Sequence, residues 1–396
     1  MSDPSRTRPR LGYPAAALVF AIGMLGTTLP TPLYGLYREE LGFSEFVVTI
    51  VFAVYAVGVI AVLLLAGNFS DEAGRRPVLL CALALSAASA LCFLFEGGLA
   101  VLLVGRLLSG FSAGLFSGAA TVTVMEVAPP DKARRAGFAA TAANMGGLGC
   151  GPLIAGLLAQ FEPSPLSLPF LVDLALIVVA CLLLWGLPET VAQRRRPRLR
   201  PQGLRVPPEV RGVFAPAAVA GFAGFALLGL FTAVAPSFLA QTLKERDLAV
   251  AGAVVFSVFL ASVVGQSLTD RIGARRTLPG GSFVLVAGLL LVAGALYWES
   301  LPLLVAGALC GGLGQGLSFR AAIGALSAAA PPEHRGATIS SFFVIAYLGI
   351  SLPVVGVGAI SLLTGLRDAG LIFSACVMLL AVCVGLYVLR RPPRPA

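Results

Sequence analysis

The fold class that the sequence predicts is an all-α integral membrane protein, and three observations predict it. The 396 residues are 58% hydrophobic and only 12% charged, which is about half the charge of a typical soluble domain. The apolar residues form continuous runs long enough to cross a bilayer, for which a helix needs about 20 residues. A unit of six such runs occurs twice, so we expect twelve transmembrane helices in two pseudosymmetric six-helix bundles.

Helices are expected for every span, because a segment in lipid must satisfy its own backbone hydrogen bonds and barrels show alternation rather than continuous apolar runs. The predicted spans are 12–35, 45–67, 78–95, 99–126, 137–160, 168–187, 213–238, 250–268, 278–297, 302–328, 337–362 and 369–389. The first run lacks a convincing cleavage site, so we interpret it as a span and not as a cleaved signal peptide.

An Arg- and Pro-rich segment, residues 188–211, is too polar to be a span and divides the chain. We expect an N-terminal six-helix bundle in 1–187, a cytoplasmic central loop in 188–211 and a C-terminal six-helix bundle in 212–396. Of the 28 Lys and Arg residues, 22 lie on the side of the termini and four on the other. The positive-inside rule therefore predicts a cell-membrane protein with both termini in the cytoplasm.

The same bias explains the net charge of +9 without a nucleic-acid partner; the basic loop is better suited to anionic lipid. The seven cysteines all lie in spans and form no CxxC pair, and His334 is the only histidine, so we expect no metal site and no catalytic residues. A membrane enzyme would need a polar catalytic cluster that the spans do not offer. The sequence has no ATP-binding loop of the Gly-x-x-x-x-Gly-Lys-Ser/Thr type, and we expect no cofactor.

A short charged connection between the second and third runs, "GNFSDEAGRR" from Gly67 to Arg76, has an echo in the second half. Asp71 and Asp270 are 199 residues apart, and so are Gly74 and Gly273. Internal repeats of this kind, with a site near the bilayer midplane between them, are typical of secondary transporters.

This loop resembles the signature of the major facilitator superfamily, Gly-x-x-x-Asp-x-x-Gly-Arg-Arg/Lys, and the resemblance extends over nearly the whole chain. It implies alternating access around a central cavity and a charged latch that closes the cytoplasmic side in the outward-facing state. Asp71 would then face the start of span eleven near residues 336–338, and Arg75 would pair with Glu126. The latch set is Gly67, Asp71, Gly74, Arg75, Arg76, Glu126, Asp270, Gly273 and Arg275. Glu72 stands where the family usually has a basic residue, and an ordinary solvated loop is the alternative.

Two charged residues inside the spans are candidates for proton coupling. Arg106, in "LLVGRLLSGFSAG", matches the Arg-x-x-x-Gly pattern of span four, where the resemblance implies a role in proton coupling; bonding to carbonyl groups of span one is the alternative. Asp173 lies about a turn inside span six, where an acid suits a proton carrier. An interfacial Asp that caps locally is equally compatible, and span one lacks the acid that many drug–proton antiporters carry.

Span five contains "GGLGCGPLIAG", residues 146–156, which resembles the drug–proton antiporter motif Gly-x-x-x-Gly-Pro-x-x-Gly-Gly. Gly147, Gly151 and Pro152 match and the final glycine pair does not. The resemblance favours export over uptake. Close packing of small residues is the alternative interpretation.

The expected substrate cavity is aromatic and weakly polar, which suits amphipathic organic molecules. Its candidates are Thr28, Tyr34, Tyr55, Phe225, Gln315 and Arg320. Arg320 could attract an anionic substrate, pair with an acid, or extend toward the cytoplasm. We therefore expect a monomeric, proton-coupled exporter of small apolar or amphipathic compounds, with a proton-coupled uptake symporter as the alternative. Its partners would be the substrate, protons and the lipid bilayer.

Overall fold

The computed structural model describes residues 11–67, 69–95, 97–192, 204 and 206–390, without the side chains of residues 270, 274 and 275. The predicted latch side chains of Asp270 and Arg275 therefore lie outside what is described. The described residues are helical with short connections and contain no strand.

Six spans make up the first half of the chain. Its elements are α1 (Tyr13–Thr28), η2 (Thr31–Leu33), α2 (Tyr34–Leu41), α3 (Glu45–Leu65), α4 (Phe69–Ala73), α5 (Arg75–Leu94), α6 (Leu99–Val127), η3 (Pro130–Lys132), α7 (Ala133–Phe161) and α8 (Leu168–Gly186). The second half has η4 (Pro208–Val210), α9 (Arg211–Gly229), the π-turn η5 (Leu230–Val234), α10 (Ala235–Gln241), α11 (Leu248–Ile272), α12 (Ala274–Trp298), α13 (Leu301–Ala329), α14 (Arg335–Thr364) and α15 (Leu366–Arg390).

The described residues form twelve helical stretches that are long and apolar enough to cross a membrane, which confirms the predicted number. Each coincides with one predicted run, and the boundaries differ most where a helix continues beyond the apolar residues. The first span reaches Leu41 through η2 and the polar helix α2, the fifth begins at Pro130, and the seventh begins at Pro208. Hydrophobicity marks the bilayer-crossing part of a helix and does not mark its solvated ends.

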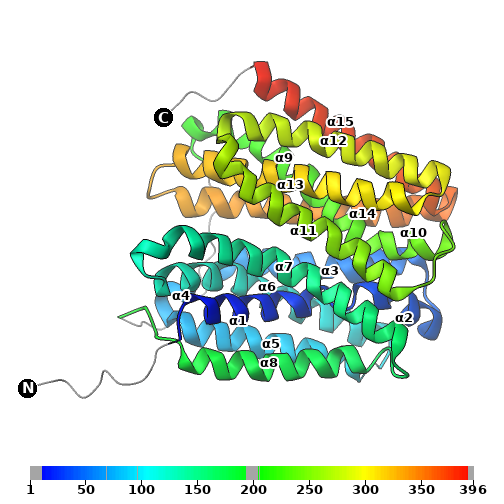
Figure 1. The fold of residues 1–396 in the computed structure, drawn as a ribbon, viewed down its shortest axis with the longest axis horizontal. Helices are drawn as coiled ribbons and strands as arrows, with labels where there is room; N and C mark the ends of the chain where they lie inside the picture. Colours follow the sequence, from blue (N-terminus) through cyan, green and yellow to red (C-terminus); the bar gives the residue numbers. More distant parts are fainter. Residues whose placement is uncertain (1–10, 68, 96, 193–203, 205, 391–396) are drawn as a thin grey trace, which may run out of the picture.

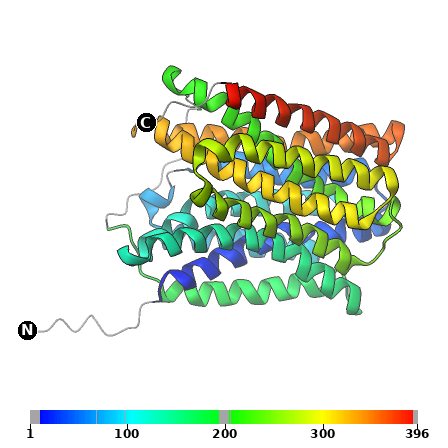
Figure 2. The ribbon, with the colours of Figure 1, turned by 45° about the horizontal axis from the view of Figure 1, so that its top comes forward.

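The two halves lie side by side with their helices running roughly along one direction (Figure 1). The helix α1 begins and α15 ends at the same end of the bundle, which we call the termini end, while α2 and α10 lie at the opposite, far end (Figures 1 and 2). The boundaries 1–187, 188–211 and 212–396 stay a prediction, although the first six and last six spans occupy the lower and upper parts of Figure 1.

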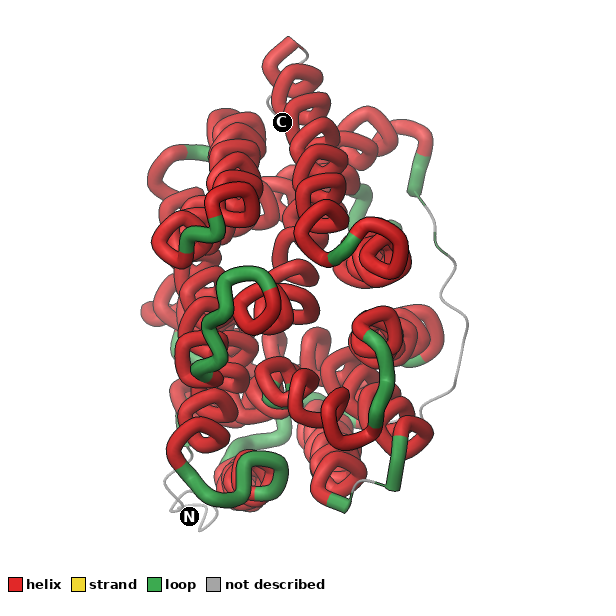
Figure 3. The backbone as a smooth tube through the Cα atoms, turned by 90° about the vertical axis from the view of Figure 1, so that its right-hand side faces the viewer, coloured by secondary structure: helices red, strands yellow, loops and turns green. Residues whose placement is uncertain are grey.

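Contacts between the halves are made mainly by two helix pairs, α7 with α11 and α3 with α14. Figure 3, viewed from the far end, shows the helices of the two halves end-on. Backbones meet without intervening side chains where α7 passes α11, because a Cβ atom placed on Gly252 would lie 2.3 Å from the carbonyl oxygen of Pro152. In lipid such close packing of small residues replaces the hydrophobic driving force that holds soluble helices together.

Candidate functional site

A cavity of about 450 Å³ lies between the halves. It is lined by α1, α3, α6 and α7 of the first half and by α9, η5, α11, α13 and α14 of the second. The wall is mainly apolar with a few hydroxyl, amide and guanidinium groups, which is the usual character of a small-molecule site. Thr121, Met125 and Arg320 are exposed lining residues near the termini end, so the cavity opens in that direction.

Four of the six predicted cavity residues line this space: Thr28, Tyr55, Phe225 and Arg320. Tyr34 does not; it lies six residues beyond Thr28, toward the far end, and lines a second cavity there. Gln315 is 1% exposed and fills the space left by Gly224 on α9. It accepts a hydrogen bond from Ser262 at 2.6 Å, and Ser262 in turn accepts one from Gln266, the residue that reaches the cavity.

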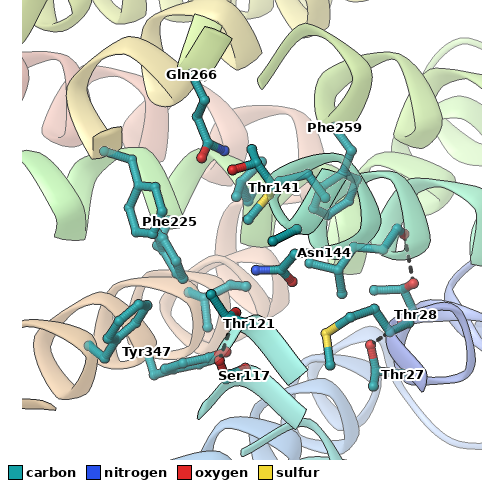
Figure 4. Close-up of a pocket in the computed structure, with 18 of the residues that line it drawn as sticks. Thr27, Thr28, Ser117, Thr121, Thr141, Asn144, Phe225, Phe259, Gln266 and Tyr347 are labelled. Atoms are coloured by element: carbon teal, nitrogen blue, oxygen red, sulfur yellow. Dashed lines mark hydrogen bonds between the residues drawn. The ribbon is translucent and has the colours of Figure 1, made fainter. Parts of the chain in front are cut away.

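Several lining residues were not predicted, notably Thr141, Asn144, Phe259, Gln266 and Tyr347 (Figure 4). Asn144 extends into the cavity from α7 (Figure 4), and Gln266 does so from α11. Both are isolated amides within apolar runs, a signal that could have identified them.

An aromatic cluster joins the halves across the cavity. The Tyr347 ring centroid lies 5.7 Å from that of Phe225 and 6.3 Å from that of Tyr55, and Phe225 lies 5.5 Å from Phe319. Edge-to-face and tilted pairs at these distances are favourable. The cluster gives the cavity an aromatic wall.

Arg106 reaches the cavity from α6 and is only 2% exposed. One guanidinium nitrogen donates to the backbone carbonyl of Thr27 at 2.7 Å. Arg106 therefore makes the bond to span one that was the alternative to a role in proton coupling. Its Cζ lies 4.7 Å from the Tyr55 ring centroid and 5.6 Å from that of Phe52. The Nε group has no hydrogen-bond partner, and no carboxylate of the described residues forms an ion pair with Arg106.

Asp173 is 2% exposed but does not line the cavity. It lies behind α1, where a Cβ atom on Gly26 would be 2.9 Å from one carboxyl oxygen and 3.0 Å from the hydroxyl of Ser86 on α5. The other oxygen, Oδ1, has no hydrogen-bond partner. Asp173 and Arg106 therefore approach neighbouring residues of α1 from different helices.

The glycines of span five serve two contacts. Gly147 and Gly151 face α1, since Cβ atoms placed on them would lie 2.4 Å from the carbonyl oxygens of Ala21 and Leu25. Pro152 and Gly156 face α11 instead, at Gly252 and Leu248. The motif thus lets α7 pack tightly within its own half and against the other half.

The loop motif at the termini end forms a cluster around Arg75, which is 6% exposed. The Arg75 guanidinium donates to Asp71 at 2.6 Å, to Ser70 at 2.7 Å and to both Glu126 oxygens at 3.1 and 3.2 Å.

The other residues of the loop motif shape the backbone or make separate contacts. Gly74 has φ +102 and Gly273, its counterpart before α12, has φ +91, a region of backbone conformation that favours glycine. Gly67 is exposed in the turn after α3, and Arg76 donates to the carbonyl of Trp185.

Glu189, just after α8, was not predicted to belong to this cluster. Its carboxylate accepts hydrogen bonds from the backbone N–H groups of Arg75 at 2.9 Å and Arg76 at 3.1 Å, so it caps α5. None of these contacts involves the second six-helix bundle. No described contact joins Asp71 to residues 336–338, and the Asp71 side chain is 62% exposed.

The far end is closed by a polar seal around Glu45, the first residue of α3. Ser237 of the second half donates to its carboxylate at 3.0 Å, and Gln241 donates to the other oxygen. Arg38 of the first half forms an ion pair with the same carboxylate. A further bond between the halves runs from the Leu248 N–H to the side-chain oxygen of Gln160 at 2.9 Å.

Sequence comparison decides the family. The family model of the Major Facilitator Superfamily matches residues 16–266 and residues 230–396. The chain belongs to the Major Facilitator Superfamily. The signature loop, the repeat and the twelve-span fold agree with this membership.

Curated relatives in this superfamily match only part of the chain. The class D tetracycline resistance protein of Salmonella ordonez is 35% identical over 163 residues, 40% of this chain and 39% of that protein. The quinolone resistance protein NorA of Staphylococcus aureus is 26% identical over 137 residues, 34% of this chain and 35% of its own. The chain thus spans less than half the length of the curated relatives that it matches.

Solved structures of the superfamily share the whole fold at low identity. The human organic anion transporter MFSD10 (TETRAN) has a TM-score of 0.68 at 18% identity, covering 97% of this chain and 100% of that one. A bacterial homologue of the human lysosomal transporter Spinster, in an inward-facing and occupied conformation, has a TM-score of 0.72 at 15% identity with full coverage of both chains. At these identities the similarity establishes the fold alone.

Proposed function

We propose that this transporter exports small apolar or amphipathic organic compounds in exchange for protons. The observation that carries the proposal is the cavity of about 450 Å³ between the halves, whose wall combines an aromatic cluster with the buried cation of Arg106. The partial similarity to tetracycline and quinolone resistance proteins supports export of organic compounds.

Alternating access would proceed from the conformation described here, which is open at the termini end and sealed at the far end. With both termini in the cytoplasm, as the positive-inside rule predicts, this cavity would load its substrate from the cytoplasm. Closing the termini end would bring Asp71 to the start of α14, where a carboxylate is favourable beside the helix N-terminus. Opening the far end would break the bonds of Glu45 to Ser237 and Gln241.

Proton coupling would use Asp173 and Arg106. A buried carboxylate with an unpartnered oxygen is costly, whereas the neutral acid is tolerated, so Asp173 suits a group that gains and loses a proton during the cycle. Arg106 and Asp173 contact adjacent residues of α1, Thr27 and Gly26, so a change at one site can act on the other through this helix.

Proton-coupled uptake of a small metabolite is the second candidate. Arg320 favours it, because a cation exposed in the cavity near the termini end could bind a metabolite anion delivered there. Proton and substrate would then move in the same direction.

The deciding experiment uses sealed proteoliposomes with a pH-sensitive dye inside and an imposed proton gradient. A panel of lipophilic cations, neutral drugs, organic acids and small nutrients is added, and wild type is compared with Asp173→Asn and Arg106→Ala. Glu40→Gln, an exposed far-end change, is the control. Drug-triggered proton movement opposite to the drug, lost in Asp173→Asn and kept in Glu40→Gln, supports antiport. A nutrient that moves together with protons, with no response to any other compound, would replace export by symport.

A further inference from the structure

The charged residues of the cavity wall have one sign. Among the described lining residues Arg106 and Arg320 are charged, and none is an Asp or Glu. The nearby acids are placed elsewhere: Asp173 lies behind α1, Glu45 lies in the far-end seal, and Glu126 is engaged by Arg75. A cationic substrate would meet two like charges and no carboxylate in the described wall.

Arg106 is the more constrained of the two arginines. The residue is 2% exposed, its guanidinium donates to one neutral carbonyl, and its Nε has no hydrogen-bond partner. A buried charge without a counter-ion is costly at this depth, and intramembrane ionisable residues pair with one another or with backbone carbonyls, of which Arg106 binds one. The described protein side chains do not supply a counter-ion, although Arg106 borders a cavity large enough for a small organic molecule.

Two of the aromatic rings of the wall already carry a protein cation. Arg106 lies over the faces of Tyr55 and Phe52, which a substrate cation would otherwise occupy. The remaining aromatic wall, from Phe225 through Tyr347 to Phe319, offers apolar contact a short distance away. Asn144 adds an amide donor from α7 (Figure 4).

We propose that the cavity takes amphipathic organic acids and that the substrate's anionic group is the counter-ion of Arg106. The apolar body of such a molecule lies on the Phe225–Tyr347–Phe319 wall, and its carboxylate meets the guanidinium beside Thr27. This inference rests on the proposed function in one respect, that the cavity is the substrate site. It adds the charge of the substrate and the residue that selects it.

The test is a binding measurement on the purified full-length protein in detergent micelles, by isothermal titration calorimetry. Three probes of similar size and different charge are compared: 1-naphthoate, 1-naphthamide and 1-naphthylmethylammonium. In wild type we expect 1-naphthoate to bind about tenfold more tightly than the amide, a ratio equal to about 1.4 kcal/mol. The ammonium compound should bind most weakly.

Variants then locate the selecting charge. Arg106→Gln should remove the difference between naphthoate and naphthamide while leaving amide binding in place, and Arg106→Lys should keep part of the difference. Arg367→Gln, at a partly exposed arginine of the far end that pairs with Glu299, is the matched control and should keep all of it. Arg320→Gln should reduce naphthoate binding less than Arg106→Gln does.

Equal affinity for acid and amide in wild type would overturn the inference without any variant, even if Arg106→Gln failed to fold. An acid preference that persists in Arg106→Gln and disappears in Arg320→Gln would overturn the assignment to Arg106. The proposed function fails separately, if no compound moves protons in proteoliposomes. Neutral drugs that drive proton movement, together with no acid preference in binding, would leave export standing and refute this inference alone.

Discussion

Replacing Glu45 by alanine is expected to shift the protein toward a conformation open at the far end. Glu45 accepts two hydrogen bonds from the other half, from Ser237 and Gln241, and these bonds exist only while the far end is closed. Its ion pair with Arg38 lies within one half and orients the carboxylate. Removing the carboxylate costs both forms the pair with Arg38 but costs only the closed form the bonds to Ser237 and Gln241, so it destabilises the closed far end relative to the open form.

The magnitude follows from the two bonds between the halves. A hydrogen bond contributes about 1 kcal/mol net, and somewhat more when one partner is charged; partial exposure of this seal argues for the lower value. Two bonds amount to about 2 kcal/mol, and since about 1.4 kcal/mol is a factor of ten, the equilibrium should move roughly 30-fold. Glu45→Gln keeps an acceptor oxygen and should give a smaller shift.

Double electron–electron resonance between spin labels at Glu162→Cys and Leu363→Cys measures this shift. These exposed positions lie at the far ends of α7 and α14, in different halves, and the seven native cysteines would first be replaced. The population of long distances should rise in Glu45→Ala and stay unchanged in Glu40→Ala, an exposed neighbour on α2. A distance distribution identical to the parent's would refute the seal.

Three further changes test other contacts. Gly74→Ala forces a residue with a side chain into φ +102 and ψ +154, which should cost about 1–3 kcal/mol of stability. Its melting temperature should therefore be lower than that of the control Gly118→Ala, where a Cβ meets nothing within 4 Å. Glu189→Ala removes the cap of α5 and should cost about 1–2 kcal/mol; a melting temperature no lower than that of Glu162→Ala would contradict the cap. Gly252→Ala places a Cβ 2.3 Å from the Pro152 carbonyl and should separate the same spin labels as Glu45→Ala, whereas Gly280→Ala should not.

The spans were predictable because the bilayer leaves helices as the main solution for apolar runs of about 20 residues. Helix extensions such as α2 and η4 were not, because outside the hydrocarbon region polarity no longer distinguishes a helix from a loop. The sequence also could not show which face of each helix lines the cavity. Both the lipid and the protein interior are apolar, so Gln315 and Tyr34 looked like cavity residues, whereas one is buried against α9 and the other lines the far cavity.

The charged contacts, too, were only partly predictable from the sequence. The resemblance in the signature loop pointed to Arg75 and Glu126, which the structure brings within 3.1 Å. The roles of Glu189 and Glu45 carry no local pattern, because the partners that define them, Arg75 and Ser237, lie more than 100 residues away along the chain. Such contacts depend on how spans are arranged, which composition and periodicity do not specify.

The arrangement around α1 would let the proposed proton site and the proposed substrate site act on each other without touching. Gly26 meets Asp173, Thr27 binds Arg106, and Thr28 donates to the carbonyl of Leu148 on α7, so three consecutive residues contact three different helices. The same stretch of α7 then meets α11 at Gly252, backbone against backbone. Contacts of this kind have few side chains that could absorb a displacement, because packed interiors deform little. A movement of α1 caused by a proton at Asp173 would therefore reach both the guanidinium in the cavity and the far-end contact between the halves, which is the coupling that an exchanger requires.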